Sequence, residues 1–315
     1  GSLSIEWSPS GSFVVIAAGN KVIVVARTET LPGSAPPNTS GFFVANVVRD
    51  LGPLHDLSID PTSRFVAVSG PKTWVLSATA SFKNVLEIEN GGATLANSWS
   101  NDGKWFATIG KDHSLVIYDT SRTDLSQWQS VFTLNTEGSG LALAWGKSTS
   151  SVGLQYCAYG GEDKQIHVVE IRTKERSWET VLAIPRDGEI NDLDWNRDGL
   201  LAAAISNGTV TVVDLSYLQS GWAVNEMDYN WQRQALTCYT EIRRNKGKHS
   251  MKTVRWIPSV SSDEPESFLA IGGTDGEVEI IDLTEGEKNR TELQHKLVEE
   301  SNDLGPHEEG STTAG

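Results

Sequence analysis

A tryptophan recurs at the same place in five of six repeated units along this chain of 315 residues. Each follows a short strand-forming stretch, and turn-forming residues come soon after it; the five are Trp7, Trp99, Trp145, Trp195 and Trp256. The remaining unit has Ile59 at that place. A period of about 40 to 60 residues, built from short strands, is typical of arrays in which each unit packs on its neighbours. The repeat therefore predicts one all-β array.

Each unit can be divided into four short strands separated by tight turns. In the third unit the expected strands are 94–100, 105–109, 115–118 and 127–134. In the fifth unit, Asp198-Gly199 and Asn207-Gly208 separate the strands, because these pairs supply the positive φ angles that tight hairpins need. A series of four-stranded antiparallel units predicts a β-propeller, with six blades visible in the sequence.

The end of the sixth unit, residues 270–282, resembles the end of a WD repeat. The two-residue signatures of that family have counterparts at Tyr118-Asp119 and Val213-Asp214, in place of Trp-Asp, and at Lys248-His249, in place of Gly-His. The resemblance covers about residues 3–283 and implies a WD40-type propeller that acts as a scaffold for protein–protein interaction. No unit has an intact Trp-Asp ending, so the buried tetrad of the family (His, Ser or Thr, Asp, Trp) is incomplete in every unit.

Three arrangements of the complete ring agree with the six units visible in the sequence. The ring is closed with six blades, or it has seven and its first blade is missing with the N-terminus. In the third explanation it is an open ring of six blades that a strand group from a partner completes, as in scaffold propellers of vesicle coats and nuclear pores. An open ring leaves unpaired strand edges that another chain can fill.

The charge of the chain limits its partners. It has 41 acidic and 26 basic residues and a net charge of −15. Nucleic acids and anionic membranes attract positive surfaces, so we expect protein partners, no nucleic acid and only indirect contact with membranes. Cys157 and Cys238 lie in expected strands and are interpreted as buried, reduced thiols. With no signal peptide visible, we expect a cytoplasmic protein, with the nucleus as the alternative.

One loop is rich in basic residues, although the chain as a whole is acidic. It lies between the fifth and sixth units and contains the candidate partner-binding residues Arg243, Arg244, Lys246, Lys248 and His249. Arginine can bind carboxylates and phosphates with two hydrogen bonds, so the loop is a candidate site for an acidic or phosphorylated peptide or a phosphoinositide headgroup. The alternative is a solvated loop that neutralises nearby acids.

Three acidic residues stand at the turn between the second and third strands of their units, namely Asp112, Asp163 and Asp275. We expect them to be structural and to accept hydrogen bonds from the backbone amides of the turn. The alternative is a binding role, because such turns lie on a face where propellers often bind. Longer loops at 28–40, 147–152, 216–230 and 259–266 are expected to project from one face.

The sequence offers little chemistry for catalysis. None of the six histidines belongs to a metal-binding pattern, and no nucleophile elbow is present. Residues 140–148 end in Gly146-Lys147-Ser148, but five residues separate the two glycines where a phosphate loop has four. We therefore expect a non-catalytic scaffold without cofactor or metal. Residues 1–300 form the expected propeller, and residues 301–315 are expected to be an acidic, disordered tail.

Overall fold

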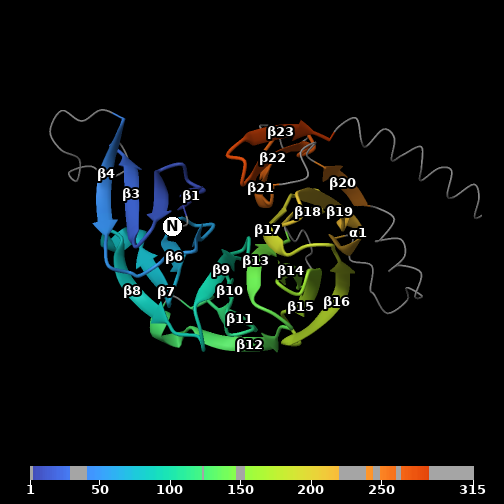
Figure 1. The fold of residues 1–315 in the computed structure, drawn as a ribbon. Coiled ribbons are helices and arrows are strands. Elements are labelled where there is room, and N and C mark those ends of the chain that lie inside the picture. The colour runs from blue at the N-terminus through green and yellow to red at the C-terminus, as the bar shows by residue number, and fades with distance from the viewer. Residues whose placement is uncertain are drawn as a thin grey trace, which may run out of the picture.

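The computed structural model describes residues 3–28, 41–122, 124–146, 153–219, 239–243, 249–259 and 264–283. These residues form six antiparallel sheets, which follow one another around a ring as the blades of a propeller (Figure 1). The predicted all-β propeller of four-stranded blades is therefore confirmed. Two short 3₁₀ turns, η1 (Ala78–Ala80) and η2 (Leu125–Gln127), and the one-turn helix α1 (Ser216–Gln219) lie between strands.

The first three blades each have four strands. The first blade contains β1 (Leu3–Trp7), β2 (Phe13–Ala18), β3 (Lys21–Arg27) and β4 (Phe42–Val48). The second contains β5 (Asp56–Ile59), β6 (Phe65–Ser69), β7 (Thr73–Ser77) and β8 (Lys83–Ile88). The third contains β9 (Thr94–Trp99), β10 (Trp105–Gly110), β11 (Ser114–Asp119) and β12 (Gln129–Asn135).

The last three blades continue the same order. The fourth blade contains β13 (Gly140–Trp145), β14 (Leu154–Gly161), β15 (Gln165–Arg172) and β16 (Ser177–Pro185). The fifth contains β17 (Ile190–Trp195), β18 (Leu200–Ile205), β19 (Thr209–Asp214) and β20 (Tyr239–Arg243). The sixth has three described strands, β21 (Met251–Ile257), β22 (Phe268–Gly273) and β23 (Val278–Asp282).

The expected strand positions agree with the structure to within one or two residues. The repeated tryptophan is the last residue of the first strand in the first, third, fourth and fifth blades, and the next-to-last residue of that strand in the sixth. Glycines also stand where sharp turns need them: Gly199 and Gly208 both have φ +89°. A Cβ atom at Gly208 would lie 2.7 Å from the carbonyl oxygen of His249, so this hairpin also needs a residue without a side chain.

Five apolar clusters fill the five junctions between consecutive blades. The first strands of neighbouring blades contact one another in the order β1, β5, β9, β13, β17 and β21. Each junction has buried side chains from both sheets; representative pairs are Phe13 with Leu76, Val75 with Phe106, Ile117 with Val169, Val168 with Leu201, and Val212 with Ile271. The core of the protein therefore consists of five layers between sheets, and each blade depends on its neighbours.

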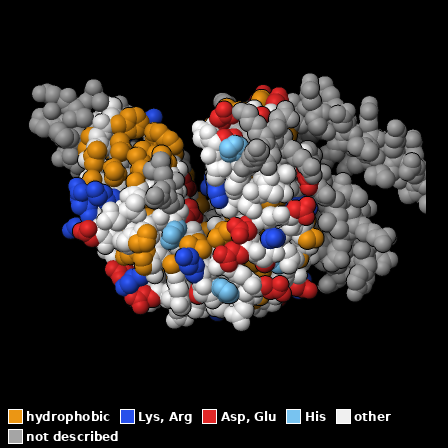
Figure 2. Space-filling view, in the orientation of Figure 1, with side chains coloured by type: hydrophobic (Ala, Val, Ile, Leu, Met, Phe, Trp, Pro, Cys, Tyr) orange, Lys and Arg blue, Asp and Glu red, His pale blue; other side chains and the backbone are white. Residues whose placement is uncertain are grey.

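The ring is open between its first and last blades. Figure 1 shows the β1–β4 sheet and the β21–β23 sheet on opposite sides of an opening, and the space-filling view has a notch at the same place (Figure 2). Among the described residues, no apolar cluster joins these two sheets. The closed six-bladed ring, the first of the three explanations, is therefore not the arrangement observed. We refer to this opening, bounded by the outward faces of the first and last blades, as the seam.

Candidate functional site

The first wall of the seam is the outward face of the first blade. Strand pairing places Trp7 opposite Val14, Ile5 opposite Ile16, and Val25 opposite Val44 on this face. Trp7, Ile5 and Val44 are all more than half exposed. In Figure 2 this wall is a continuous hydrophobic patch. A contiguous apolar surface of this kind on a folded domain marks a contact site or an aggregation hazard.

Aromatic side chains from the two edge strands of the blade, β1 and β4, meet on this wall. The rings of Trp7 and Phe42 meet edge to face, with their centroids 5.8 Å apart. The guanidinium of Arg27 lies 5.6 Å from the centroid of the Phe42 ring. Phe42 itself is 45% exposed, so the pair forms a raised apolar edge with a cation beside it. Such pairs are typical of anchors at protein interfaces.

The second wall is the outward face of the sixth blade. Pairing of β22 with β23 places Val278 opposite Gly272 and Ile280 opposite Ala270, on the same face as Phe268. The exposed fractions are 77% for Val278, 64% for Ile280 and 44% for Phe268. The opposite face of this blade is covered by the fifth blade. Among the described residues, only one side of the sixth blade is packed against another sheet.

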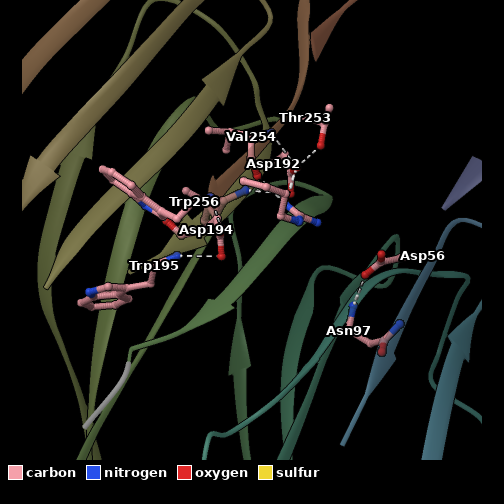
Figure 3. A network of polar contacts seen from close by, with 10 residues as sticks. Asp56, Asn97, Asp192, Asp194, Trp195, Thr253, Val254 and Trp256 are labelled. Atoms are coloured by element: carbon pink, nitrogen blue, oxygen red, sulfur yellow. Dashed lines mark hydrogen bonds and ion pairs between the residues drawn. The ribbon is translucent and has the colours of Figure 1, made fainter. Parts of the chain in front are cut away.

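Acidic side chains on the first strands join neighbouring blades near the axis of the ring (Figure 3). The Asp194 carboxylate on β17 accepts a hydrogen bond of 2.7 Å from the backbone N–H of Trp256 on β21. Asp192, two residues earlier, accepts one of 3.0 Å from the N–H of Val254. The Asp56 carboxylate on β5 accepts a hydrogen bond of 3.0 Å from the backbone N–H of Asn97 on β9. Each acid therefore satisfies a backbone donor of the following blade.

Glu6 makes the corresponding contact at the beginning of the ring. Its carboxylate accepts a hydrogen bond from the backbone N–H of Ile59 in the second blade. Burial, together with the nearby Asp56 carboxylate, raises the pKa of Glu6 to about 8. Burial also raises the pKa of Asp56, to about 6. The inner edge of the first two blades is thus a place where negative charge is disfavoured.

Arg255 has the opposite charge at the end of the ring. Its guanidinium donates a hydrogen bond of 2.6 Å to the Asp192 carboxylate. The nearby carboxylates of Asp192 and Asp194 raise the pKa of Arg255. Its side chain nevertheless remains 57% exposed, at the inner end of the second wall. Arg255 and Glu6 both line the central cavity, which has a volume of about 1020 Å³ and opens toward the seam.

The predicted basic loop lies largely outside the described residues. Arg243 ends β20, where its backbone pairs with Thr209, and His249 precedes β21. The candidates between them, Arg244, Lys246 and Lys248, fall outside the described residues, as does the side chain of Arg243. Most of the predicted long loops, and residues 284–315 with the expected tail, also lie outside them. The binding role of this loop stays a prediction.

The three turn acids each contact their own hairpin. Asp163 and Asp275 accept backbone N–H bonds, both of 3.2 Å, from Gln165 and Glu277. Asp163 also lies 2.7 Å from the Nε2 atom of His167 across the hairpin. Asp112 accepts a hydrogen bond from the Ser114 hydroxyl instead. These contacts are compatible with the expected structural role and do not test a binding role.

The residue-level details of the seam were not part of the sequence prediction. Trp7 has the same local pattern as the buried tryptophans, so nothing near it in the sequence indicates exposure. A usable signal was the alternation of the apolar residues Val278 and Ile280 along the last expected strand of the sixth unit. Cys157 is a buried free thiol, and its burial raises its pKa; Cys238 lies outside the described residues.

The described ranges contain neither a metal-binding cluster nor a membrane-spanning helix. Within those ranges, no three His, Cys, Asp or Glu side chains are grouped so that they could hold a metal ion. The same ranges contain no helix with the length and apolar character needed to cross a bilayer.

Comparison with known proteins supports the architecture. No protein-family model matches the chain, and no curated protein matches it in sequence. Among solved structures, the chain is similar to U3-55K, a WD40 protein, with a TM-score of 0.64. The sequence identity is 12%, over 90% of this chain and 78% of that chain. At this identity the likeness shows the fold alone, and the fold is that of a WD40-type β-propeller.

Proposed function

We propose that this protein is a non-catalytic scaffold for protein–protein interaction, and that the seam is its principal binding surface. The observation that carries the proposal is the pair of exposed apolar walls, with Trp7 on one and Ile280 on the other. Burying an apolar side chain is favourable by about 25 cal/mol for each Å² removed from water, so two such walls favour a macromolecular contact. The WD40-type fold is consistent with this role, because it holds such surfaces in a fixed geometry.

The test is the size and composition of the native complex. The endogenous protein, tagged without other change, is isolated gently and its mass is measured by mass photometry. We expect a stoichiometric complex with a mass clearly larger than that of the tagged protein alone. The variant Val278→Asp/Ile280→Asp should be recovered with at least tenfold less of that partner. A native protein that remains a free monomer would refute the scaffold function.

A second candidate function uses the basic loop at 243–249. Its clustered cations in a chain of net charge −15 favour a phosphoinositide or a phosphorylated peptide as ligand. Flotation with liposomes that contain or lack phosphoinositides tests the lipid, and fluorescence anisotropy with paired phosphorylated and unphosphorylated peptides tests the peptide. We also propose a cytoplasmic location, with the nucleus as the alternative, which imaging of the tagged protein checks.

A further inference from the structure

We propose that a pocket between the third and fourth blades, away from the seam, is a binding site for a phosphoryl group. The pocket has a volume of about 490 Å³, which is the size of a small-molecule site. Its walls come from the β9–β10 turn, the first residues of β14 and the β15–β16 turn, and we call it the junction pocket. Phosphorylated peptides and small phosphate esters share the phosphoryl group, and the experiment separates these two sources.

Trp105 places a hydrogen-bond donor without an acceptor in the wall of the junction pocket. In five blades, a residue near the start of the second strand accepts the backbone N–H of the residue after the repeated tryptophan or Ile59; these residues are Phe13, Phe65, Trp105, Tyr156 and Leu200. Phe13, Phe65 and Leu200 have no polar side-chain atom, and the Tyr156 hydroxyl donates to Glu170 at 3.1 Å. Trp105 is 9% exposed, and its indole N–H has no acceptor among the described residues. A ligand that supplies an acceptor would satisfy this donor.

The indole N–H of Trp105 is held in place and remains accessible. The ring of Trp178 packs edge to face on that of Trp105, with the centroids 6.3 Å apart. Trp99 and Trp195 also have indole nitrogens without partners, but these are completely covered by protein atoms. That of Trp105 is not covered in this way, and its residue lines the pocket. The donor is therefore available to a molecule in the junction pocket.

Two cations that line the junction pocket have no counter-ion in the part of the chain that the structure describes. Lys174 and Arg176 are exposed residues of the β15–β16 turn, and the side chain of neither forms a hydrogen bond or an ion pair with another described residue. The stem of Lys174 lies along Gly153 in the pocket wall, because a Cβ atom there would be 3.3 Å from the lysine Cγ and 3.4 Å from its Cε. A third cation, Lys104, lies 3.5 Å from the Asp102 carboxylate and is partly neutralised.

The two acids of the junction pocket already have donors. The Asp102 carboxylate accepts hydrogen bonds from the Ser100 hydroxyl at 2.7 Å and from the Gln155 amide at 2.9 Å. The Asp119 carboxylate accepts one of 3.0 Å from the backbone N–H of Ser121. The available groups are therefore two cations and the indole N–H, which are all donors. An anionic ligand fits this set, and a cationic ligand does not.

The charge of the available groups favours a phosphoryl group over a carboxylate. A phosphate monoester carries a charge of about −1.5 to −2 at pH 7 and has three acceptor oxygens. Lys174 and Arg176 match that charge, and an arginine can donate to two phosphoryl oxygens at once. A carboxylate has a single charge and would leave one cation without a counter-ion. In a chain of net charge −15, two unpaired cations beside a pocket also reduce the repulsion that an anion meets elsewhere.

Titration of the isolated protein with phenyl phosphate tests the site. Labelling the tryptophans with the isotope ¹⁵N gives one NMR signal for each indole N–H, and Trp105→Phe identifies the signal of Trp105. We expect phenyl phosphate to shift this signal until the site is saturated, because a phosphoryl oxygen accepts the indole N–H. Benzoate, which has a similar ring but a single negative charge, should bind at least tenfold more weakly.

A pair of double variants tests the two cations. Lys174→Gln/Arg176→Gln should weaken the binding of phenyl phosphate at least tenfold. The matched control Lys21→Gln/Lys83→Gln removes two exposed cations from the first and second blades and should leave the affinity unchanged. Since all four residues are exposed, the melting temperature of both variants should stay within about 2 °C of that of the wild type.

Inorganic phosphate and a degenerate library of phosphoserine peptides identify the source of the phosphoryl group. A peptide selected from the library that binds at least tenfold more tightly than inorganic phosphate, and loses binding without its phosphate, would assign the site to a phosphorylated peptide. If no peptide binds more tightly than inorganic phosphate, the source is a small phosphate ester.

Three results would overturn the phosphoryl site. The first is a Trp105 signal that neither phenyl phosphate nor inorganic phosphate shifts. The second is benzoate binding as tight as that of phenyl phosphate. The third is equal affinity of Lys174→Gln/Arg176→Gln and its control. None of these results bears on the scaffold function, which depends on the seam.

Discussion

The junction between the fifth and sixth blades and the seam are built from equivalent positions but differ in what covers them. At the junction, Trp256 is 6% exposed, and its backbone N–H and indole N–H both reach Asp194 of the preceding blade. At the seam, Trp7 is 54% exposed. Because the two tryptophans share their local sequence pattern, the difference comes from the neighbouring sheet. The environment of a blade residue is therefore a property of the pair of blades.

The largest effect is expected when the two tryptophans are truncated in the isolated protein. Trp256→Ala should lower the free energy of unfolding by about 3–5 kcal/mol, because it removes a buried ring and leaves a cavity. Trp7→Ala should cost less than about 1 kcal/mol, since most of its surface is already in contact with water. Urea unfolding of both variants measures the difference. Equal costs would mean that Trp7 is buried and that the seam is closed.

A smaller effect is expected from the acid that joins the fifth and sixth blades. Asp194→Ala removes the acceptor of the Trp256 backbone N–H and also of the Trp195 N–H, which lies 3.0 Å from the carboxylate. Leaving such donors without partners should lower the free energy of unfolding by about 1–3 kcal/mol in urea unfolding. Glu175→Gln, at an exposed position of the fourth blade, is the matched control and should change it by less than about 0.5 kcal/mol. A loss no larger than that of the control would refute the joining role of the acid.

The pH dependence of stability tests the inner edge of the seam. The folded pKa values of Glu6, about 8, and Asp56, about 6, lie above their ordinary values of 4.5 and 3.8. The folded protein therefore binds more protons than the unfolded chain between about pH 4 and pH 8, so stability falls as pH rises through that window. Glu6→Gln should make the melting temperature less dependent on pH between 5 and 9, as measured by calorimetry.

The control for the pH experiment is again Glu175→Gln, which leaves the inner edge intact. This variant should have the same pH dependence as the wild type. If Glu6→Gln also has the wild-type dependence, Glu6 titrates as an ordinary exposed acid, and the inner edge of the first blade is more open than the structure shows.

The smallest effect on the folded protein is expected from the basic loop. Arg243→Glu/Arg244→Glu should leave the melting temperature unchanged within about 2 °C, because Arg243 is the last residue of β20, the edge strand of its sheet. It should weaken binding of an acidic or phosphorylated ligand, measured by anisotropy, if the loop is a second binding surface. Unchanged binding would exclude the basic loop as a binding surface, and the seam would remain the proposed site.

The fold could be predicted from the sequence because its signals are local. The tryptophan positions and pairs such as Asn207-Gly208 locate strands and hairpins within each unit. The seam could not be predicted in detail. The exposure of Trp7 depends on whether another sheet packs on its face of the blade, and the residues near Trp7 in the sequence do not encode this. The contact of Asp194 with Trp256 likewise joins residues 62 positions apart. The basic loop was found by composition, but its geometry lies outside the described residues.

The most direct test of the open seam is the solvent exposure of Trp7 in the isolated protein. The chain, with its 11 tryptophans replaced by 5-fluorotryptophan, can be studied by fluorine NMR with an uncharged paramagnetic chelate, and Trp7→Phe assigns the Trp7 signal. We predict strong broadening of the Trp7 signal and little change in those of Trp99, Trp145, Trp195 and Trp256. A Trp7 signal protected as well as that of Trp256 would contradict the open ring.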